Sequence, residues 1–558
     1  MVRRIFELFH KEFRKVQEAA FLLAVATIAS NILGIVRDRL LASRFGAGEE
    51  LDIYYAAFRV PDILYTLSLF FVASTAIIPL FLERIAQNEE RAREFTQTIL
   101  VAFLLGITVL IGAAYVAMPA IMPFLVPGFD PAMHAEAVQL SRVMLLSPLL
   151  LGLSNLASSI LQSFRRFFPY AASFLFYNLG IIVGIVFFVP HIGLSGLAWG
   201  VVFGALLHVG IQIPSLVHTG YFPRLALQRR ALLMEVFRRS LPRTLGLVAM
   251  QCAFLAVTAI ASLLGVGSIA IFQLAYNLQS IPLAVIGLSY SVAAFPTMTE
   301  LIVKKERSLF FDHLFSASRH ILFWTLPSAV LFIVLRAQIV RVVLGAGAFS
   351  WVDTRLTAAS LALFALGIVA QSLSALFVRA FYAIGNVRVP VVVNILSAGF
   401  TVVCAVVFVG ILREAEGLTY VFVRMLRVAD VPNVAVLGLV LAFAVGAIAN
   451  AVVLGLSLGW IEGETHSRNL RTSVVDITGA SILLGVVSYG VLQMLALVFD
   501  LTSFFGIFAQ GLLAGLAGII VAAVFLHARQ NKEYGEIRNS MSRRFWRKET
   551  IGPEQEHL

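Results

Sequence analysis

The stretch TQTILVAFLLGITVLIGAAYVAM (residues 96–118) decides the fold class, because it runs for 23 residues without one charged side chain. A bilayer core of about 30 Å needs roughly 20 consecutive apolar residues in a helix. Lipid offers no partner for unpaired backbone groups, so only closed hydrogen-bonded structures such as helices can cross it. This stretch therefore predicts a membrane-spanning helix.

Comparable apolar runs recur along the whole chain of 558 residues. The fourteen runs lie at 19–41, 54–82, 96–118, 137–163, 169–189, 193–217, 241–264, 270–298, 318–345, 356–383, 388–411, 434–458, 473–498 and 503–527. We therefore expect an all-α polytopic membrane protein with 14 transmembrane helices.

The composition agrees with this class and argues against a soluble enzyme. Charged residues make up 13% of the chain, about half of the ~25% typical of soluble domains, whereas hydrophobic residues make up 59%. The two cysteines cannot form a disulfide framework. The sequence contains no Walker-type phosphate loop, no His-Glu-x-x-His motif and no paired cysteine motif. We therefore expect no enzyme activity, no cofactor and no metal site.

The distribution of basic residues predicts the orientation. If the N-terminus is cytoplasmic, 30 of the 42 Lys and Arg residues fall in cytoplasmic segments and 7 in outer loops. This excess follows the positive-inside rule, so both termini are expected in the cytoplasm. Topology and anionic lipid headgroups then account for the net charge of +11, and no nucleic-acid partner is needed.

Two marks recur at nearly the same offset, which indicates an internal duplication. Pro79 is followed four residues on by Glu83, and Pro296 likewise by Glu300. Basic residues also come just before Pro169 and just before Pro390. Transporters are often built from such repeats, although chance agreement of proline positions is an alternative.

The expected organisation follows from the runs and the repeat. The chain would comprise an amphipathic cytoplasmic segment (1–18), an N-lobe of six spans (19–218), a cytoplasmic linker (219–240), a C-lobe of six spans (241–458), two added spans (459–528) and a cytoplasmic tail (529–558). For residues 1–18, a plain solvated cap is the alternative to a helix lying in the membrane interface. The loop at 413–432 (REAEGLTYVFVRMLRVADVP) is basic and partly apolar, which predicts a short helix on the outer surface.

Charged residues inside apolar spans are candidate sites, because each costs at least ~2.5 kcal/mol at bilayer depth. In the first span Asn31, Gly34 and Asp38 share one helical face, with Arg37 beside them. Asp52 follows a short turn, and Arg59 begins the motif RVPD.

The turn that joins the two spans contains Gly46 and Gly48. Glycine permits a tight turn, which would bring Asp38 and Asp52 near the two arginines. The arginines would then fork onto phosphate oxygens while the acids hold them in place. An internal Arg–Asp lock at a helix end explains the same residues equally well.

Other polar residues within the spans are predicted to form hydrogen bonds between helices, because most polar groups in membrane helices do so. They are Asn155, Asn178, Gln251, Gln273, Asn277, Gln371 and Asn394.

The segment SNILGIVRDRLLASRFGAGEELDIYYAAFRVPDIL (30–64) resembles the opening signature of the MurJ/MviN lipid II flippases, in the multidrug/oligosaccharidyl-lipid/polysaccharide exporter superfamily. Supporting resemblances cover ILQSFRRFFPYAASFLFYN (160–178), AWGVVFGALLHVGIQIP (198–214) and FYAIGNVRVPVVVNI (381–395).

The resemblance implies a two-lobed, V-shaped carrier with a cationic central cavity and a lipid groove near the last two spans. Such a carrier would move lipid II, the undecaprenyl-diphosphate-linked peptidoglycan precursor, from the inner to the outer leaflet of the bacterial cytoplasmic membrane by alternating access. It would serve cell-wall biogenesis and cell shape. Its partners would be the lipid-linked precursor, membrane lipids and cell-wall synthesis proteins, and we expect a monomer.

The resemblance also assigns roles to individual residues. Arg37 and Arg59 match basic positions of the family, and Asn31 and Asn277 stand where the family usually carries cavity arginines. We expect these four residues to form the substrate-binding site. The remaining assignments are Asp38 and Asp52 as supporting residues that switch charge, and Gly34, Gly46, Gly48 and Pro61 as hinges.

Two alternative functions remain open at this point. The chain could be a related exporter, acting on another polyprenol-linked oligosaccharide or as a cation-coupled drug antiporter. It could also be a transport-inactive scaffold for cell-wall synthesis.

Overall fold

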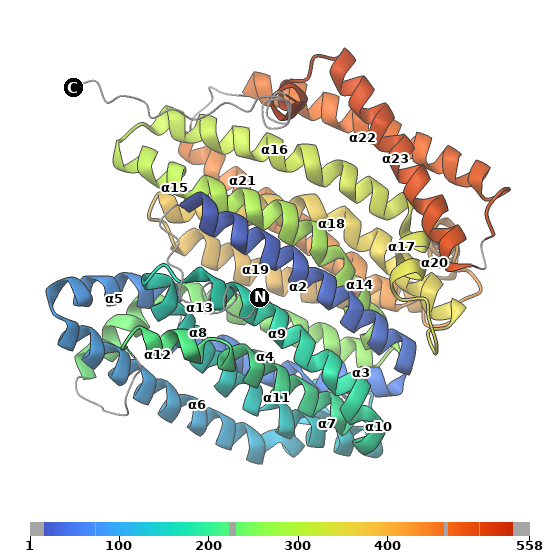
Figure 1. Ribbon diagram of the computed structural model, residues 1–558. Coiled ribbons are helices and arrows are strands. Elements are labelled where there is room, and N and C mark those ends of the chain that lie inside the picture. Colours follow the sequence, from blue (N-terminus) through green and yellow to red (C-terminus); the bar gives the residue numbers. More distant parts are fainter. Residues whose placement is uncertain (1–15, 73, 222–229, 463–466, 501–502, 539–558) are drawn as a thin grey trace, which may run out of the picture. The chain divides into compact units, whose positions relative to one another are not determined.

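Every regular element of the computed structural model is a helix, within residues 16–72, 74–221, 230–462, 467–500 and 503–538, which are the residues that the structure describes (Figure 1). The expected all-α class is confirmed for these residues.

The helices up to the middle of the chain are α2 (Val16–Phe45), α3 (Glu49–Ala57), α4 (Arg59–Val72), α5 (Ser74–Gln87), α6 (Glu89–Leu125), α7 (Pro131–Met144), α8 (Leu146–Ser163), α9 (Phe167–Val183), η1 (Gly184–Phe188), α10 (Val189–Ile192), α11 (Ser195–Gly210), α12 (Ile213–His218), α13 (Arg230–Ser262) and α14 (Ser268–Pro282). They are followed by η2 (Leu283–Leu288), α15 (Ser289–Val303), α16 (Arg307–Val334), α17 (Arg336–Val343), α18 (Trp351–Ala383), α19 (Arg388–Glu414), α20 (Glu416–Leu426), α21 (Val436–Glu462), α22 (Ser467–Leu495) and α23 (Phe504–Ala528). The elements η1 and η2 are π-helical turns.

Eleven helical segments in the described residues are long and apolar enough to cross a membrane. They coincide with eleven of the fourteen predicted runs. The other three runs, at 19–41, 54–82 and 241–264, do not meet this criterion among the described residues. In the last of them the apolar stretch Gly246–Ser262 is the C-terminal half of the longer helix α13.

The first two predicted spans differ from the structure in their helix boundaries. The helix α2 continues to Phe45, beyond the predicted end of the first run at residue 41, and Arg37 and Asp38 lie within this helix as expected. The second run is divided among α3, α4 and α5. Pro61 is the third residue of α4, where its missing N–H has no partner to lose. The ninth run is also divided, because α16 ends at Val334 before α17 begins.

Local sequence explains several helix starts, because the first four N–H groups of a helix lack partners within it. The Asn88 side chain accepts from the N–H of Glu90 at the start of α6. Asp130 does the same for Met133 at the start of α7, next to a proline at the first helical position. Ser503 accepts from the N–H of Gly506 at the start of α23.

The chain forms two compact units, each built from separate stretches of sequence. The first unit comprises Met1–Ile281, Val340–Gly367 and Gly385–Leu454. Within it α2 packs against α9, α9 against α11, and α13 against both α4 and α19. One of its cores is rich in aromatic rings, with Phe81, Phe95 and Phe103 fully buried. These packed helices hold the candidate site.

The second unit comprises Pro282–Ile339, Ile368–Ile384 and Gly455–Leu558. Within it α22 packs against α16 and α23, around a core that includes Phe323 and Leu484. Residues 532–538 are helical, and the buried Glu533 carboxylate accepts from Arg319 Nε at 2.7 Å. Part of the predicted tail is therefore packed, while residues 539–558 lie outside the described residues.

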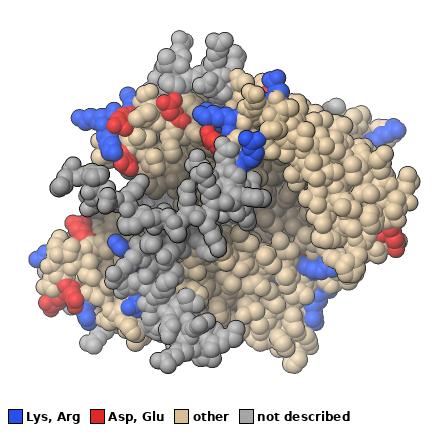
Figure 2. Space-filling model, turned by 45° about the horizontal axis from the view of Figure 1, so that its top comes forward, with Lys and Arg blue, Asp and Glu red and all other residues tan. Residues whose placement is uncertain are grey.

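Uncharged side chains dominate the described surface on the face that Figure 2 shows, and the charged side chains there form small separate groups. An extensive apolar surface is what a lipid-exposed protein requires, because hydrocarbon cannot solvate charge. The predicted amphipathic segment at 1–18 lies almost wholly outside the described residues.

Candidate functional site

Arg37 and Asp38 form an ion pair in the second half of α2. The Asp38 Oδ1 atom accepts from Arg37 Nε at 2.9 Å and from Arg37 Nη2 at 2.7 Å. Asp38 is buried, whereas the Arg37 side chain keeps 22% of its surface exposed. A buried carboxylate is strongly destabilised unless a cation and hydrogen bonds compensate its charge. Arg37 compensates the charge of Asp38 in this way.

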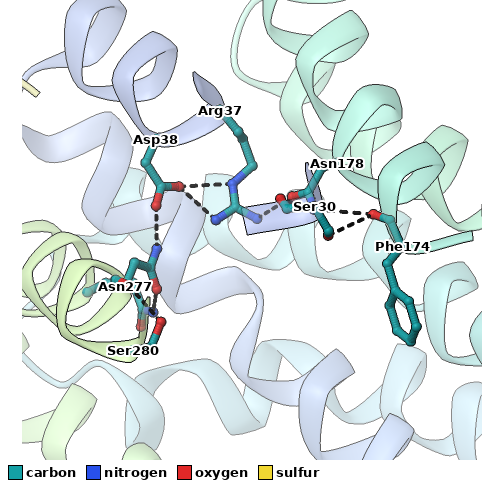
Figure 3. A network of polar contacts seen from close by, with 8 residues as sticks. Ser30, Arg37, Asp38, Phe174, Asn178, Asn277 and Ser280 are labelled. Atoms are coloured by element: carbon teal, nitrogen blue, oxygen red, sulfur yellow. Dashed lines mark hydrogen bonds and ion pairs between the residues drawn. The ribbon is translucent and has the colours of Figure 1, made fainter. Parts of the chain in front are cut away.

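Two asparagines from other helices extend the pair (Figure 3). Asp38 Oδ2 accepts from Asn277 Nδ2 of α14 at 3.0 Å, and Asn178 Oδ1 of α9 accepts from Arg37 Nη1 at 3.1 Å. The Asn178 amide in turn donates to Ser30 Oγ of α2 at 3.1 Å. The network therefore joins α2, α9 and α14 inside the first unit. Arg37 uses three of its five N–H groups in these contacts.

Arg59, at the start of α4, lies at the other end of the same network. Its Nε donates to Thr258 Oγ1 at 2.8 Å and its Nη2 to Gln273 Oε1 at 2.9 Å. The guanidinium also lies 5.3 Å from the centre of the Phe254 ring, which is a cation–π distance. Both hydrogen bonds go to neutral side chains, and Arg59 is 7% exposed.

Gln273 and Asn277 link the two arginines. Gln273 Nε2 donates to Asn277 Oδ1 at 2.8 Å, one helical turn along α14. A continuous series of hydrogen bonds therefore runs from Arg59 through both amides to Asp38 and Arg37. We name these five residues the arginine relay.

Asp52 does not hold an arginine in the structure, and this expectation was wrong. Its carboxylate accepts from the N–H of Gly267 at 2.6 Å and of Ala270 at 2.7 Å, at the start of α14. An acid at a helix N-terminus satisfies unpaired N–H groups and opposes the helix dipole. Asp52 thus positions the helix that carries Gln273 and Asn277, and its influence on the arginines is indirect.

Asn31 shares the face of Asp38 on α2 but makes no contact with the relay. Its Nδ2 atom is buried and has no hydrogen-bond partner among the described residues. Such an atom usually costs about 1–3 kcal/mol, so it is a candidate contact for a polar ligand.

The predicted hinge residues occupy different environments. Gly46 has a φ of +62°, and a Cβ there would lie 2.8 Å from the Ala348 carbonyl oxygen, so glycine is required. Gly48 precedes the first residue of α3. A Cβ on Gly34 would lie 4.0 Å from Asn178 Oδ1, beside the relay. Pro61 is buried at the start of α4.

The sequence did not show that Asn178 and Gln273 contact the arginines of the site. The expectation that Asn178, Gln273 and Asn277 form hydrogen bonds between helices is confirmed, but only Asn277 was expected at the site. Their spacing held a partial signal, because Gln273 and Asn277 are four residues apart and so lie on one helical face. Among the described residues, no group of three or more His, Cys, Asp or Glu side chains could hold a metal ion.

Comparisons with known proteins agree on one family. The family model described as lipid II flippase MurJ matches residues 41–510. The chain is 26% identical over 500 residues to the lipid II flippase MurJ of Burkholderia cenocepacia, covering 85% of this chain and 89% of the relative. It is 30% identical over 380 residues to the probable lipid II flippase MurJ of Buchnera aphidicola, covering 66% and 73%.

Solved structures show the same fold at lower identity. A structure described as lipid II flippase MurJ in an inward closed conformation matches with a TM-score of 0.73 at 23% identity, covering 92% of this chain and 100% of the other. An inward-facing multidrug resistance MATE family transporter of the MOP superfamily matches with a TM-score of 0.62 at 15% identity, covering 82% and 99%.

Proposed function

This chain belongs to the lipid II flippase MurJ family, and from that premise we propose that it moves lipid II across the bacterial cytoplasmic membrane by alternating access. Lipid II carries a diphosphate between its polyprenol and its sugar headgroup. The observation that carries the proposal at this site is the arginine relay, which holds two guanidinium groups on the first spans of the chain.

The two arginines have different roles in this mechanism. Arg37 is partly exposed and keeps unused N–H groups, so it meets the diphosphate first. Phosphate oxygens are good acceptors for the planar guanidinium fork. Asp38 holds Arg37 in place. When the diphosphate leaves, the ion pair between Asp38 and Arg37 forms again, which returns the carrier to its empty state.

Arg59 is buried, so it contacts the substrate only after its surroundings rearrange. Its present acceptors are a neutral amide and a hydroxyl group, both weaker than an anionic phosphate oxygen. An incoming diphosphate would therefore favour a state in which Arg59 is released toward it. A ligand shifts a conformational equilibrium in this way only through its stronger binding to one state.

The proposed topology is 14 spans with both termini in the cytoplasm, in two lobes (19–218 and 241–458) followed by two added spans. Two helix starts support the duplication: α9 begins at Phe167 with Pro169 as its third residue, and α19 begins at Arg388 with Pro390 as its third. We place the protein in the inner membrane as a monomer, in contact with membrane lipids and with cell-wall synthesis proteins.

Translocation of labelled lipid II in reconstituted vesicles tests the function. The Arg37→Ala and Arg59→Ala double variant should lose at least about tenfold in rate, the equivalent of roughly 1.4 kcal/mol. Arg142→Ala on α7 is the matched control, because that half-buried arginine contacts Tyr115 of α6 and lies outside the relay. Unimpaired transport by the double variant would remove the proposed roles of Arg37 and Arg59.

Mass spectrometry of lipids that co-purify with the protein separates lipid II from other headgroups. A diphosphate-linked muropeptide is the expected species. Recovery of a different polyprenol sugar would point to another exporter of the superfamily. A partner-binding protein that moves no lipid in vesicles would be a scaffold.

A further inference from the structure

The helix α20 is apolar on two opposite faces. Its inner face is formed by Phe422, Val423 and Leu426, and Val423 is 6% exposed. A helix on an aqueous surface usually places polar residues opposite such a face. The outer face of α20 is instead largely apolar.

The outer face carries large exposed hydrophobic side chains. Tyr420 is 57% exposed, Val421 is 58% exposed and Met425 is 75% exposed. Their spacing places them together with Gly417 and Arg424 on one side of the helix, in a pattern of three- and four-residue steps. We name these five residues the outer face of α20. Its one charged group is a guanidinium.

This face is held in place at both ends of the helix. Before α20, Arg413 Nη2 donates to the Leu263 carbonyl oxygen at 2.6 Å. After it, Arg355 donates to both oxygens of Asp430 at 2.7 and 2.6 Å, and to the carbonyl oxygen of Arg427. The exposure of Tyr420, Val421 and Met425 therefore belongs to an anchored helix and not to a frayed end.

The position of α20 along the chain places it at a membrane surface. Ala415 alone separates it from α19, whose most apolar window has a mean hydropathy of 2.6. Exposed side chains of α19, such as Val403 and Val406, are the hydrophobic residues that lipid would cover. A helix that follows directly on the end of a span lies near the depth of the headgroups.

The chemistry of the outer face fits that depth. Arg424 lies with its guanidinium 5.9 Å from the centre of the Tyr420 ring and donates to the Tyr420 hydroxyl at 3.2 Å. Tyrosine is enriched where membrane meets water, because its ring is apolar and its hydroxyl is polar. Arginine extends its charge toward phosphates while its stem stays in apolar surroundings.

We propose that α20 is an interfacial anchor whose outer face inserts among the lipids of the adjacent leaflet. Val421 and Met425 enter the acyl region, while Tyr420 and Arg424 contact the headgroups. Charge complementarity favours lipid as the occupant, because the one charged side chain among the five residues of the outer face is the cation Arg424, which meets anionic phosphates. The anchor stands apart from the transport function.

Site-directed spin labelling in the full chain tests the proposal. Cys252 and Cys404 are replaced by Ala, and nitroxides are attached to Val421→Cys and, separately, Met425→Cys in vesicles of phosphatidylethanolamine and phosphatidylglycerol. Collision with oxygen reports lipid, and collision with a water-soluble nickel chelate reports water. Val406→Cys on α19 is the lipid control, and Glu90→Cys at the exposed start of α6 is the water control.

The expected result is a ratio of oxygen to nickel collisions at 421 and 425 that is shifted from the Glu90→Cys value toward the Val406→Cys value. A nickel-dominated ratio at both positions would place the outer face in water and overturn the anchor. Low collision with both reagents would mean that a second copy or another protein covers the face, and would overturn it equally. Both labelled positions are exposed, so neither label needs to disturb the fold.

Discussion

At the scale of single residues, Gln273 is the residue on which the relay depends most. It accepts from Arg59 and donates to Asn277, so one amide side chain joins the two halves of the network. The direction of donation is the same along the series from Arg59 to Asp38, whose carboxylate is the common acceptor at its end. An aliphatic residue at position 273 would interrupt the series.

We predict that Gln273→Leu destabilises the protein by about 1–3 kcal/mol, because it leaves the buried Arg59 Nη2 without its amide acceptor. The midpoint of thermal unfolding in detergent measures this loss. Gln251→Leu on α13 is the control, since its amide makes a long contact of 3.3 Å with Thr66 and lies outside the relay. Equal stability of the two variants would contradict the relay.

Asp52 shows why part of the site could not be predicted from sequence. The turn at Gly46 and Gly48 was expected to bring Asp52 near Arg37 and Arg59. Its partner is instead the N-terminus of α14, about 215 residues away along the chain. A carboxylate that is near an arginine in sequence can instead bind the unpaired backbone N–H groups at a helix start. Folding brings those groups to it from a distant part of the chain, so the local sequence does not reveal them.

At the scale of elements, the C-terminal helical segment 532–538 fastens one end of the second unit. Glu533 is 1% exposed and accepts from Arg319 of α16, while Ser473 of α22 donates to both of its oxygens at 3.1 and 3.2 Å. One carboxylate thus ties the C-terminal segment to two membrane helices.

We predict that Glu533→Gln costs up to about 3 kcal/mol, because the Arg319 side chain, which is 14% exposed, loses the buried anion that pairs with it. Glu536→Gln is the matched control, as that side chain is 47% exposed in its contact with His320. Thermal unfolding of both variants in one detergent measures the difference. A Glu533→Gln midpoint as high as that of Glu536→Gln would show that the segment is not a fastening element.

The ion pair between Arg355 and Asp430, which we call the clamp, holds the end of α20 and predicts that stability depends on pH. The Arg355 guanidinium beside Asp430 lowers the pKa of that carboxyl group below its ordinary value. A carboxyl group whose pKa is lower in the folded state stabilises the fold when it is ionised. This stabilisation is complete at pH values above the ordinary carboxyl pKa, near 3.9, and is lost as the pH falls through the lowered pKa.

Wild-type protein should therefore exceed Asp430→Asn in thermal midpoint by a constant amount above about pH 5, and the gap should close at lower pH. In an Arg355→Gln background the Asp430→Asn change should have no effect at any pH. A gap that widens on acidification would contradict the clamp.

At the scale of the whole molecule, apolar run length predicts the helices well where the spans are uninterrupted. Eleven of the fourteen runs overlap helices of membrane length among the described residues, although the ninth run extends beyond the end of α16. Apolar run length ended the first run at residue 41, although α2 continues to Phe45, and it did not show that Arg37 and Asp38 find polar partners on α9 and α14. Composition cannot detect that compensation, since it is supplied by distant helices.

The proposed orientation is testable with the same cysteine-free background. A membrane-impermeant thiol reagent applied to whole cells should label Ala429→Cys, in the predicted outer loop, and should not label Glu90→Cys until the membrane is opened. The reverse pattern would invert the topology, and with it the direction of transport.

The central claim is that Arg37 and Arg59 together bind the diphosphate of a lipid-linked precursor. Its most direct test is native mass spectrometry of the purified protein titrated with lipid II, comparing wild type with the Arg37→Ala and Arg59→Ala double variant and with Arg142→Ala. We predict binding by wild type and Arg142→Ala, and at least about tenfold weaker binding by the double variant. Equal affinity of all three proteins would contradict the claim.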